Sequence, residues 1–231
     1  MVTYNVYRDG SKVASGLKEK TYTDEGLTPN TQYQYQVSAE NLVGESELSD
    51  LVTLTTNYSE PQSIDVSPKT NNLNVGGLKN LTAKVSPDTA KQTVTWSSTD
   101  DKIATIDTNG KVSAVSKGQV TITATSTDKG DVKGTATVNV KQPVTGVTIS
   151  PKSAEIEVGS TQQLTATIAP DNADNKKVTY STSDDTIAVV NSSGLVTSKK
   201  EGQATITVTT EDGIKTDTAA ITVVPKPEEG A

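Results

Sequence analysis

The chain has 231 residues and contains neither histidine nor cysteine, which excludes Ser–His–Asp and Cys–His nucleophilic systems, zinc sites built on those ligands, and disulfide bonds. Its formal net charge is −7, and Arg8 is its sole arginine. Nucleic acids and anionic membranes require a basic surface, and a bilayer span requires about 20 apolar residues, so we expect no nucleic-acid partner and no membrane insertion.

The first part of the chain, residues 1–56, is predicted to form strands. The segments 2–6 and 33–39 alternate apolar and polar residues with period two, which is typical of strands with one buried face. Asp9-Gly10 follows the first of these segments and is a hairpin turn signal. We expect a sheet whose apolar face carries Tyr4, Tyr33, Tyr35 and Val37.

A set of short motifs in this part is similar to fibronectin type III domains. The motifs are Tyr4–Gly10, Thr21–Asp24, Leu27–Tyr33, Val37–Asn41 and Gly44–Ser46. The spacing of Leu27, Pro29 and Tyr33 resembles the tyrosine corner of that family, which implies that the Tyr33 hydroxyl hydrogen-bonds to nearby backbone.

The resemblance is incomplete, because a full domain would carry two more strands ahead of Tyr4. The apolar face would then lack most of its opposing sheet, and a unit below about 60 residues is marginally stable even when complete. An open edge and a half-covered apolar face favour the addition of a strand from another chain. We therefore expect Tyr4, Tyr33, Tyr35 and Val37 to form a partner-docking face.

The rest of the chain is an internal repeat. A linker at residues 57–61 leads to a first repeat at 62–141 and a second at 144–224, and a polar tail follows at 225–231. Ser63–Lys69 returns as Gly146–Lys152, 83 positions later. This period is too long for a solenoid unit and indicates self-contained domains in tandem, an arrangement that sets distance and displays surface.

Both repeats are predicted to consist of short strands. Asn109-Gly110 and the equivalent Ser193-Gly194 are hairpin signals, and 120–124 alternates in the manner of a strand. No window of more than eight residues has a convincing helical period, so we expect an all-β protein.

The repeats resemble the bacterial immunoglobulin-like group 2 family, on Val158–Ala166, Ile187–Val190, Gly194–Thr197 and Glu201–Val208. The first repeat has the same skeleton, with Trp96 where the second has Tyr180. This resemblance implies tandem immunoglobulin-like β-sandwiches in an elongated array, as in bacterial surface adhesins, accessory regions of cell-wall enzymes and tailed-phage virion proteins.

The acidic residues that could be catalytic or bind calcium have simpler structural interpretations. Asp100-Asp101 and Asp184-Asp185 could act as catalytic carboxylates or calcium ligands. Adjacent strand residues point to opposite faces, however, which makes them a poor acid/base pair. Turns in which Asp accepts backbone amides are favoured. The acidic loops 127–131 and 210–213 hold two acids each, which favours hairpin turns over calcium sites.

The aromatic residues of the repeats have two interpretations. Trp96 and Tyr180 are expected to anchor the cores rather than to stack on sugars.

Outside the repeats, Tyr7, Tyr22 and Tyr58 are better candidates for exposed aromatic surface. A bond between a Lys and an Asn side chain stays an open alternative. No catalytic residue, metal ligand or cofactor site is assigned.

These features together predict a non-enzymatic tailed-phage virion component, of decoration, tail-associated or fibre type. The sequence starts without the charged and apolar regions of a secretory signal, which we expect of a protein assembled in the cytoplasm. Immunoglobulin-like domains on the virion surface would bind host cell-surface glycans weakly. Residues 1–56 would attach to another virion protein or to a second copy of the chain.

The alternative is a stalk or accessory segment of a Gram-positive cell-surface adhesin or cell-wall hydrolase. The chain would then be extracellular, on the bacterial cell surface, and the missing strands would lie upstream in the parent protein.

Overall fold

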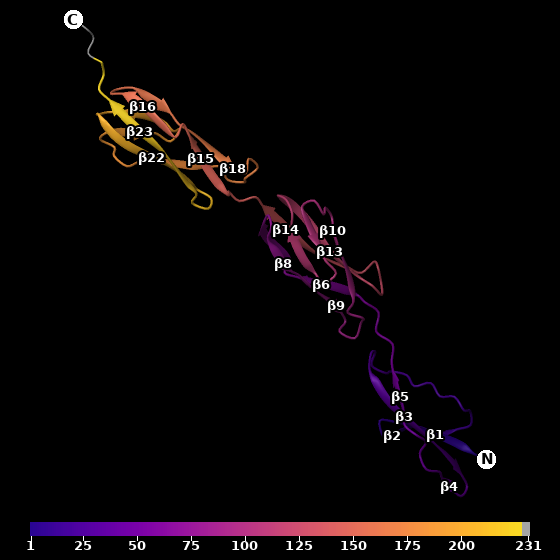
Figure 1. The fold of residues 1–231 in the computed structure, drawn as a ribbon. Coiled ribbons are helices and arrows are strands. Elements are labelled where there is room, and N and C mark those ends of the chain that lie inside the picture. The colour runs from indigo at the N-terminus through magenta and orange to yellow at the C-terminus, as the bar shows by residue number, and fades with distance from the viewer. Residues whose placement is uncertain (228–231) are drawn as a thin grey trace.

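A computed structural model describes residues 1–227, which form three β-units in a row with the N-terminus at one end (Figure 1). The described residues contain strands and turns and no helix, and therefore no helix that could span a membrane. The predicted all-β class, with immunoglobulin-like units in tandem, is confirmed. Part of the predicted polar tail, residues 228–231, lies outside the described residues.

The first unit is a single antiparallel sheet. Its strands are β1 (Thr3–Arg8), β2 (Ser11–Leu17), β3 (Gln32–Asn41), β4 (Gly44–Glu45) and β5 (Val52–Thr55). They lie in the order β2-β1-β3-β4, and β5 pairs with the other end of β3. Asp9 and Gly10 have positive φ angles of 50° and 77°, as the predicted hairpin turn between β1 and β2 requires.

The first repeat contains nine strands in three sheets. Its strands are β6 (Ser63–Ser67), β7 (Thr70–Asn74), β8 (Leu78–Asn80), β9 (Thr82–Ser86), β10 (Val94–Ser98), β11 (Ala104–Ile106), β12 (Lys111–Ala114), β13 (Gly118–Ser126) and β14 (Lys133–Lys141). The sheets have the orders β10-β13-β14-β7, β11-β12-β8 and β6-β9. β7 runs parallel to β14, whereas the other pairs are antiparallel.

The second repeat has the same topology. Its strands are β15 (Gly146–Ser150), β16 (Ser153–Glu157), β17 (Thr161–Gln163), β18 (Thr165–Ala169), β19 (Val178–Thr182), β20 (Ala188–Val190), β21 (Leu195–Ser198), β22 (Gly202–Thr210) and β23 (Thr216–Val224). The sheets are β16-β23-β22-β19, β17-β21-β20 and β15-β18, so each strand takes the place of the strand nine numbers before it.

The two repeats have closed cores and the first unit does not. Val66, Ile122 and Val138 are among the fully buried side chains of the first repeat, and Leu164 and Ile206 are among those of the second. The burial alternates along β13 and β22, as period-two patterning requires. In residues 1–56, all of which are described, the one buried hydrophobic side chain is Val6.

Candidate functional site

The first unit has a groove of about 720 Å³ along one face of its sheet. The four residues predicted to share an apolar face, Tyr4, Tyr33, Tyr35 and Val37, all line this groove. They come from β1 and β3, the two central strands of the sheet. Because alternate residues of a strand point to the same side, all four side chains lie on one face. Leu54 of β5 extends this floor.

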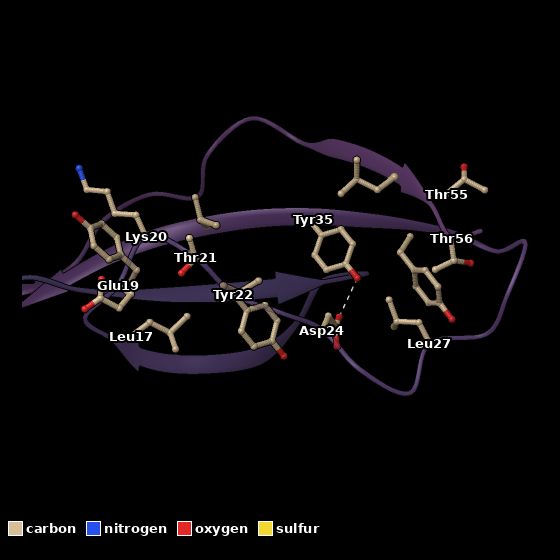
Figure 2. A pocket seen from close by; sticks show the side chains of 15 residues that line it. Leu17, Glu19, Lys20, Thr21, Tyr22, Asp24, Leu27, Tyr35, Thr55 and Thr56 are labelled. Carbon is tan, nitrogen blue, oxygen red and sulfur yellow. Dashed lines mark hydrogen bonds between the residues drawn. The ribbon is translucent and has the colours of Figure 1, made fainter. Parts of the chain in front are cut away.

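The opposite wall of the groove is the segment of residues 18–27, which crosses in front of the sheet (Figure 2). Asp24 fixes this segment in place. Nη1 of Arg8 donates to both carboxylate oxygens of Asp24, at 3.0 and 2.9 Å, and the Tyr35 hydroxyl donates to Oδ2 at 2.8 Å. Burial raises the pKa of Tyr35, and its hydrogen bond to Asp24 raises that pKa further.

The wall segment is not part of the sheet. Within the described part of the chain, the amides and carbonyls of residues 18–27 make no hydrogen bond. An extended segment of this kind has free backbone donors and acceptors, which a neighbouring strand could pair with.

The residues of the predicted tyrosine corner lie at one end of the groove. The Tyr33 hydroxyl accepts a hydrogen bond from the amide of Thr28 at 3.0 Å. The guanidinium of Arg8 lies 5.5 Å from the centre of the Tyr33 ring, within the range of a cation–π contact. Leu27 precedes Thr28 and lines the groove, so the corner holds one end of the wall segment.

The apolar floor of the groove is open to solvent. Val37 is 46% exposed and Leu54 is 56% exposed, although both lie on strands. Contiguous apolar surface of this kind on a soluble protein is characteristic of a binding site. The groove is therefore the candidate functional site of residues 1–56.

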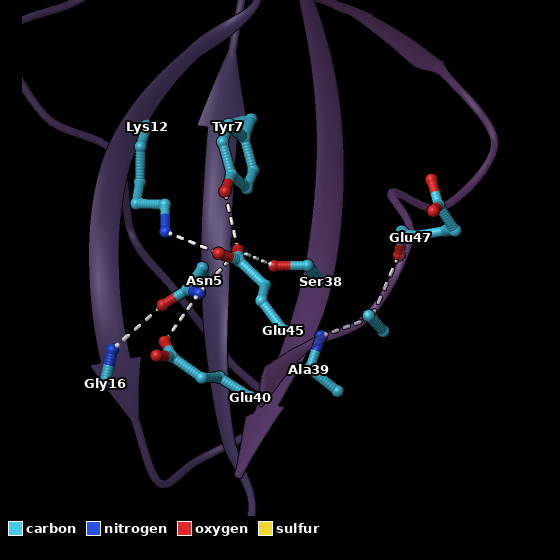
Figure 3. Close-up of polar contacts among 10 residues, drawn as sticks. Asn5, Tyr7, Lys12, Gly16, Ser38, Ala39, Glu40, Glu45 and Glu47 are labelled. Atoms are coloured by element: carbon cyan, nitrogen blue, oxygen red, sulfur yellow. Dashed lines mark hydrogen bonds and ion pairs between the residues drawn. The ribbon is translucent and has the colours of Figure 1, made fainter. Parts of the chain in front are cut away.

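The other face of the sheet is closed by a polar network (Figure 3). Glu45 accepts hydrogen bonds from Ser38, from Tyr7 at 2.6 Å, from Asn5 at 2.7 Å and from Lys12 at 3.0 Å. These bonds, led by the one from Ser38, lower the pKa of Glu45 to about 2. Asn5 is completely buried beneath the network, so polar side chains cover this face of the sheet.

The same network contains the residue types that a bond between a Lys and an Asn side chain would need. Lys12, Asn5 and Glu45 do meet, but the Lys12 side chain is 37% exposed and pairs with Glu45 as an ion. A carboxylate with so low a pKa stays ionised at neutral pH, whereas proton transfer would need a carboxyl group that titrates near the working pH. No local pattern of residues predicts this network, because Asn5 and Glu45 lie 40 positions apart in the chain.

The paired aspartates of the repeats lie in turns rather than in strands. Oδ1 of Asp100 accepts the amide of Lys102 at 2.9 Å, and Oδ1 of Asp184 accepts the amide of Thr186 at 2.9 Å. Within residues 1–227 no group of three or more acidic residues is placed to hold a metal ion. The geometry is that of Asx turns.

The aromatic residues of the repeats pack against the cores. Trp96 and Tyr180 are partly buried against them. A methyl group on Gly110 would come within 3.2 Å of the Trp96 ring, and one on Gly194 within 2.9 Å of the Tyr180 ring. Each hairpin turn therefore covers its ring closely.

The remaining aromatic candidates, Tyr7, Tyr22 and Tyr58, lie in and next to the first unit. Tyr7 belongs to the polar network and Tyr22 lines the groove. Tyr58, in the linker, is 53% exposed.

Comparison with known proteins places the repeats in a family. Residues 61–138 and 143–223 match the family model described as bacterial Ig-like domain (group 2). The chain is 42% identical over 169 residues to an Ig-like virion protein of Serratia phage KSP90, covering 70% of this chain and 65% of that protein. It is 47% identical over 76 residues to a lacto-N-biosidase of Bifidobacterium bifidum, covering 33% of this chain and 7% of that protein.

Among solved structures, Drosophila N-cadherin EC1-4 is similar with a TM-score of 0.46 and 13% identity, covering 87% of this chain and 59% of that one. The chain spans less than two thirds of the length of the relatives named here. Because the family model matches more than half of its residues, the chain belongs to the bacterial Ig-like domain (group 2) family.

Proposed function

We propose that this chain is a non-enzymatic structural and adhesive component of a tailed-phage virion that displays its two immunoglobulin-like repeats outward. The observation that carries the proposal is the 42% identity to an Ig-like virion protein over 70% of the chain. The composition supports it, because a chain without histidine or cysteine lacks the usual nucleophilic and proton-transfer groups.

Attachment to the particle is assigned to the groove of the first unit. Its floor carries exposed apolar side chains, among them Val37 and Leu54, and its wall at residues 18–27 offers unpaired backbone groups. A β-strand from another virion protein or from a second copy would satisfy both surfaces. It would pair with the wall through its backbone and place every second, apolar side chain in the groove.

The repeats would carry the host-facing surface. Their aromatic residues pack on the cores, so contact with host cell-surface glycans would depend on exposed polar side chains and would be weak for each copy. Many copies on one particle would raise the overall affinity by raising the effective concentration.

Electron microscopy of virions labelled with an antibody to residues 144–224 tests the proposal. The expected result is regular labelling on the surface of intact particles, with no labelling of particles from which the gene is deleted. The absence of label from particles that contain the other virion proteins would overturn the proposal.

A second candidate function is a stalk or accessory segment of a bacterial cell-surface protein. The match to part of a Bifidobacterium lacto-N-biosidase favours it, because there the similar region is a small share of a long protein. Recovery of the chain in the cell-wall fraction, as part of a longer polypeptide, would support this alternative instead of the virion.

A further inference from the structure

We propose that the chain has one stiff joint and one pivot: residues 62–224 move as a single arm, and this arm turns on Tyr58. The two joints between the three units are built differently, although the two repeats share one topology.

The joint between the repeats is bound on several sides. The amide of Gln142 donates to Oδ2 of Asp174 at 2.6 Å, and the amide of Asp174 donates back to the carbonyl of Gln142 at 2.9 Å. Two residues further on, the amide of Val144 donates to Oδ2 of Asp212 at 2.9 Å, and the Val144 side chain is buried. The linker is thus attached to the second repeat from its first residue after β14.

A side chain of the first repeat also crosses this joint. Lys117 lies between β12 and β13, and its Nζ is 2.6 Å from Oδ1 of Asp174 and 3.5 Å from the carbonyl oxygen of Asn172. The bond from Lys117, followed by the one from the Gln142 amide, lowers the pKa of Asp174. Asp174 therefore holds both the linker and the preceding repeat, which leaves the two repeats little freedom to bend.

The joint ahead of the first repeat lacks such a cross-link. The carbonyl of Asn57 accepts the amide of Asn30 at 2.9 Å, which ties Asn57 to the first unit. The amide of Ser59 donates to the carbonyl of Thr89 at 3.1 Å, which ties Ser59 to the first repeat.

No hydrogen bond or ion pair joins residues 1–56 directly to residues 62–227, which are the described part beyond the linker. Tyr58 is left between the two anchors, exposed and with two soft backbone dihedral angles.

The sequence explains the difference. The residue 83 positions before Asp174 is Lys91, so the first repeat has a cation where the second has the carboxylate that binds Lys117. This position of the first repeat therefore cannot accept a lysine from the unit before it. A long arm on a pivot would let the repeats search a wide volume around the site where residues 1–56 are held.

Pulsed electron paramagnetic resonance on the full chain can measure both joints, because a protein without cysteine accepts spin labels at chosen positions. Labels at the exposed strand residues Thr53 and Thr105 span the pivot, and labels at Thr105 and Thr167 span the stiff joint. We expect a broad distance distribution for the first pair and a distribution several-fold narrower for the second. Equal widths for the two pairs would overturn the proposal.

Variants of Asp174 test whether this residue makes the joint between the repeats stiff. Asp174→Ala should broaden the Thr105–Thr167 distribution and leave the Thr53–Thr105 distribution unchanged. The matched control is Asp171→Ala, which removes the same charge from an exposed residue of the same loop and should change neither. Equal effects of the two variants, or none from Asp174→Ala, would contradict the assigned role.

Lys117→Met provides a second variant, located in the other repeat. It should broaden the same distribution, and 1 M salt should act in the same direction because it shortens the Debye length to about 3 Å. An unchanged thermal melt by circular dichroism shows that both repeats remain folded. An unchanged distance distribution in Lys117→Met would show that the hydrogen bonds of the linker alone make the joint stiff. It would overturn the proposed cross-link through Lys117.

Discussion

The hydroxyl of Tyr35 donates a hydrogen bond of 2.8 Å to Oδ2 of Asp24, and this contact joins the floor of the groove to its wall. Arg8, the sole arginine of the chain, reaches the same carboxylate from β1. One carboxylate thus holds a segment that makes no backbone hydrogen bond of its own in the described structure. The shape of the groove depends on this arrangement.

Asp24→Ala should release the wall of the groove. Its loss leaves Arg8 and Tyr35 without their shared acceptor and should lower the stability of the first unit. Amide hydrogen exchange in residues 18–27 should become faster, while exchange in the repeats stays the same. Glu25→Ala, at an exposed neighbour, is the control and should leave exchange unchanged. Similar exchange in both variants would show that Asp24 does not hold the wall.

The polar network makes the first unit sensitive to acid. Glu45 has a folded-state pKa of about 2, below its ordinary value of 4.5, so the network stabilises the unit fully above pH 5. That stabilisation is lost as the pH falls from 4.5 towards 2. Amide exchange at Asn5 and Ser38, corrected for its intrinsic pH dependence, should show increasing local opening over this range.

Two glutamine variants separate this effect from general acid denaturation. Glu45→Gln should remove the pH dependence at Asn5 and Ser38. Glu47→Gln changes a neighbouring exposed carboxylate and should preserve it. A pH profile that is the same in both variants would assign the effect to other groups.

The hairpin glycine of the first repeat should tolerate no side chain. Gly110 has a φ of 80°, and a Cβ there would lie 2.5 Å from the carbonyl oxygen of Leu81. Gly110→Ala should therefore destabilise the first repeat by about 1–3 kcal/mol. Urea unfolding followed by the fluorescence of Trp96, the sole tryptophan, measures the change.

Gly130→Ala is the matched control in the same repeat. A Cβ at Gly130 meets nothing within 4 Å, so the urea midpoint should remain close to that of the parent chain. A Gly110→Ala midpoint equal to that of Gly130→Ala would show that the turn can relax.

Local features of this fold could be predicted from the sequence. Asn109-Gly110 predicts the β11–β12 hairpin because its turn chemistry acts over a few residues, and Oδ1 of Asp107 accepts the amides of Asn109 and Lys111 there. The alternation in residues 33–39 predicts that Tyr33, Tyr35 and Val37 lie on one face, because side chains along a strand alternate between its two sides.

Contacts between distant residues could not be predicted in the same way. Asp24 lies 16 residues from Arg8, and Asp174 lies 57 residues from Lys117, so each contact depends on how strands and units pack. The parallel pairing of β7 with β14 is of the same kind. Charge and spacing alone give no preference among the many carboxylates of an acidic chain.

The proposed attachment requires that another polypeptide occupies the groove of the first unit. A photo-crosslinking amino acid at Val37, on the floor of the groove, tests this in assembled particles, with Gln34 on the opposite face of β3 as the control position. We predict an efficient crosslink to a second polypeptide from position 37 and little from position 34. Crosslinks from position 37 that stay within the same polypeptide, or equal yields from the two positions, would contradict the claim.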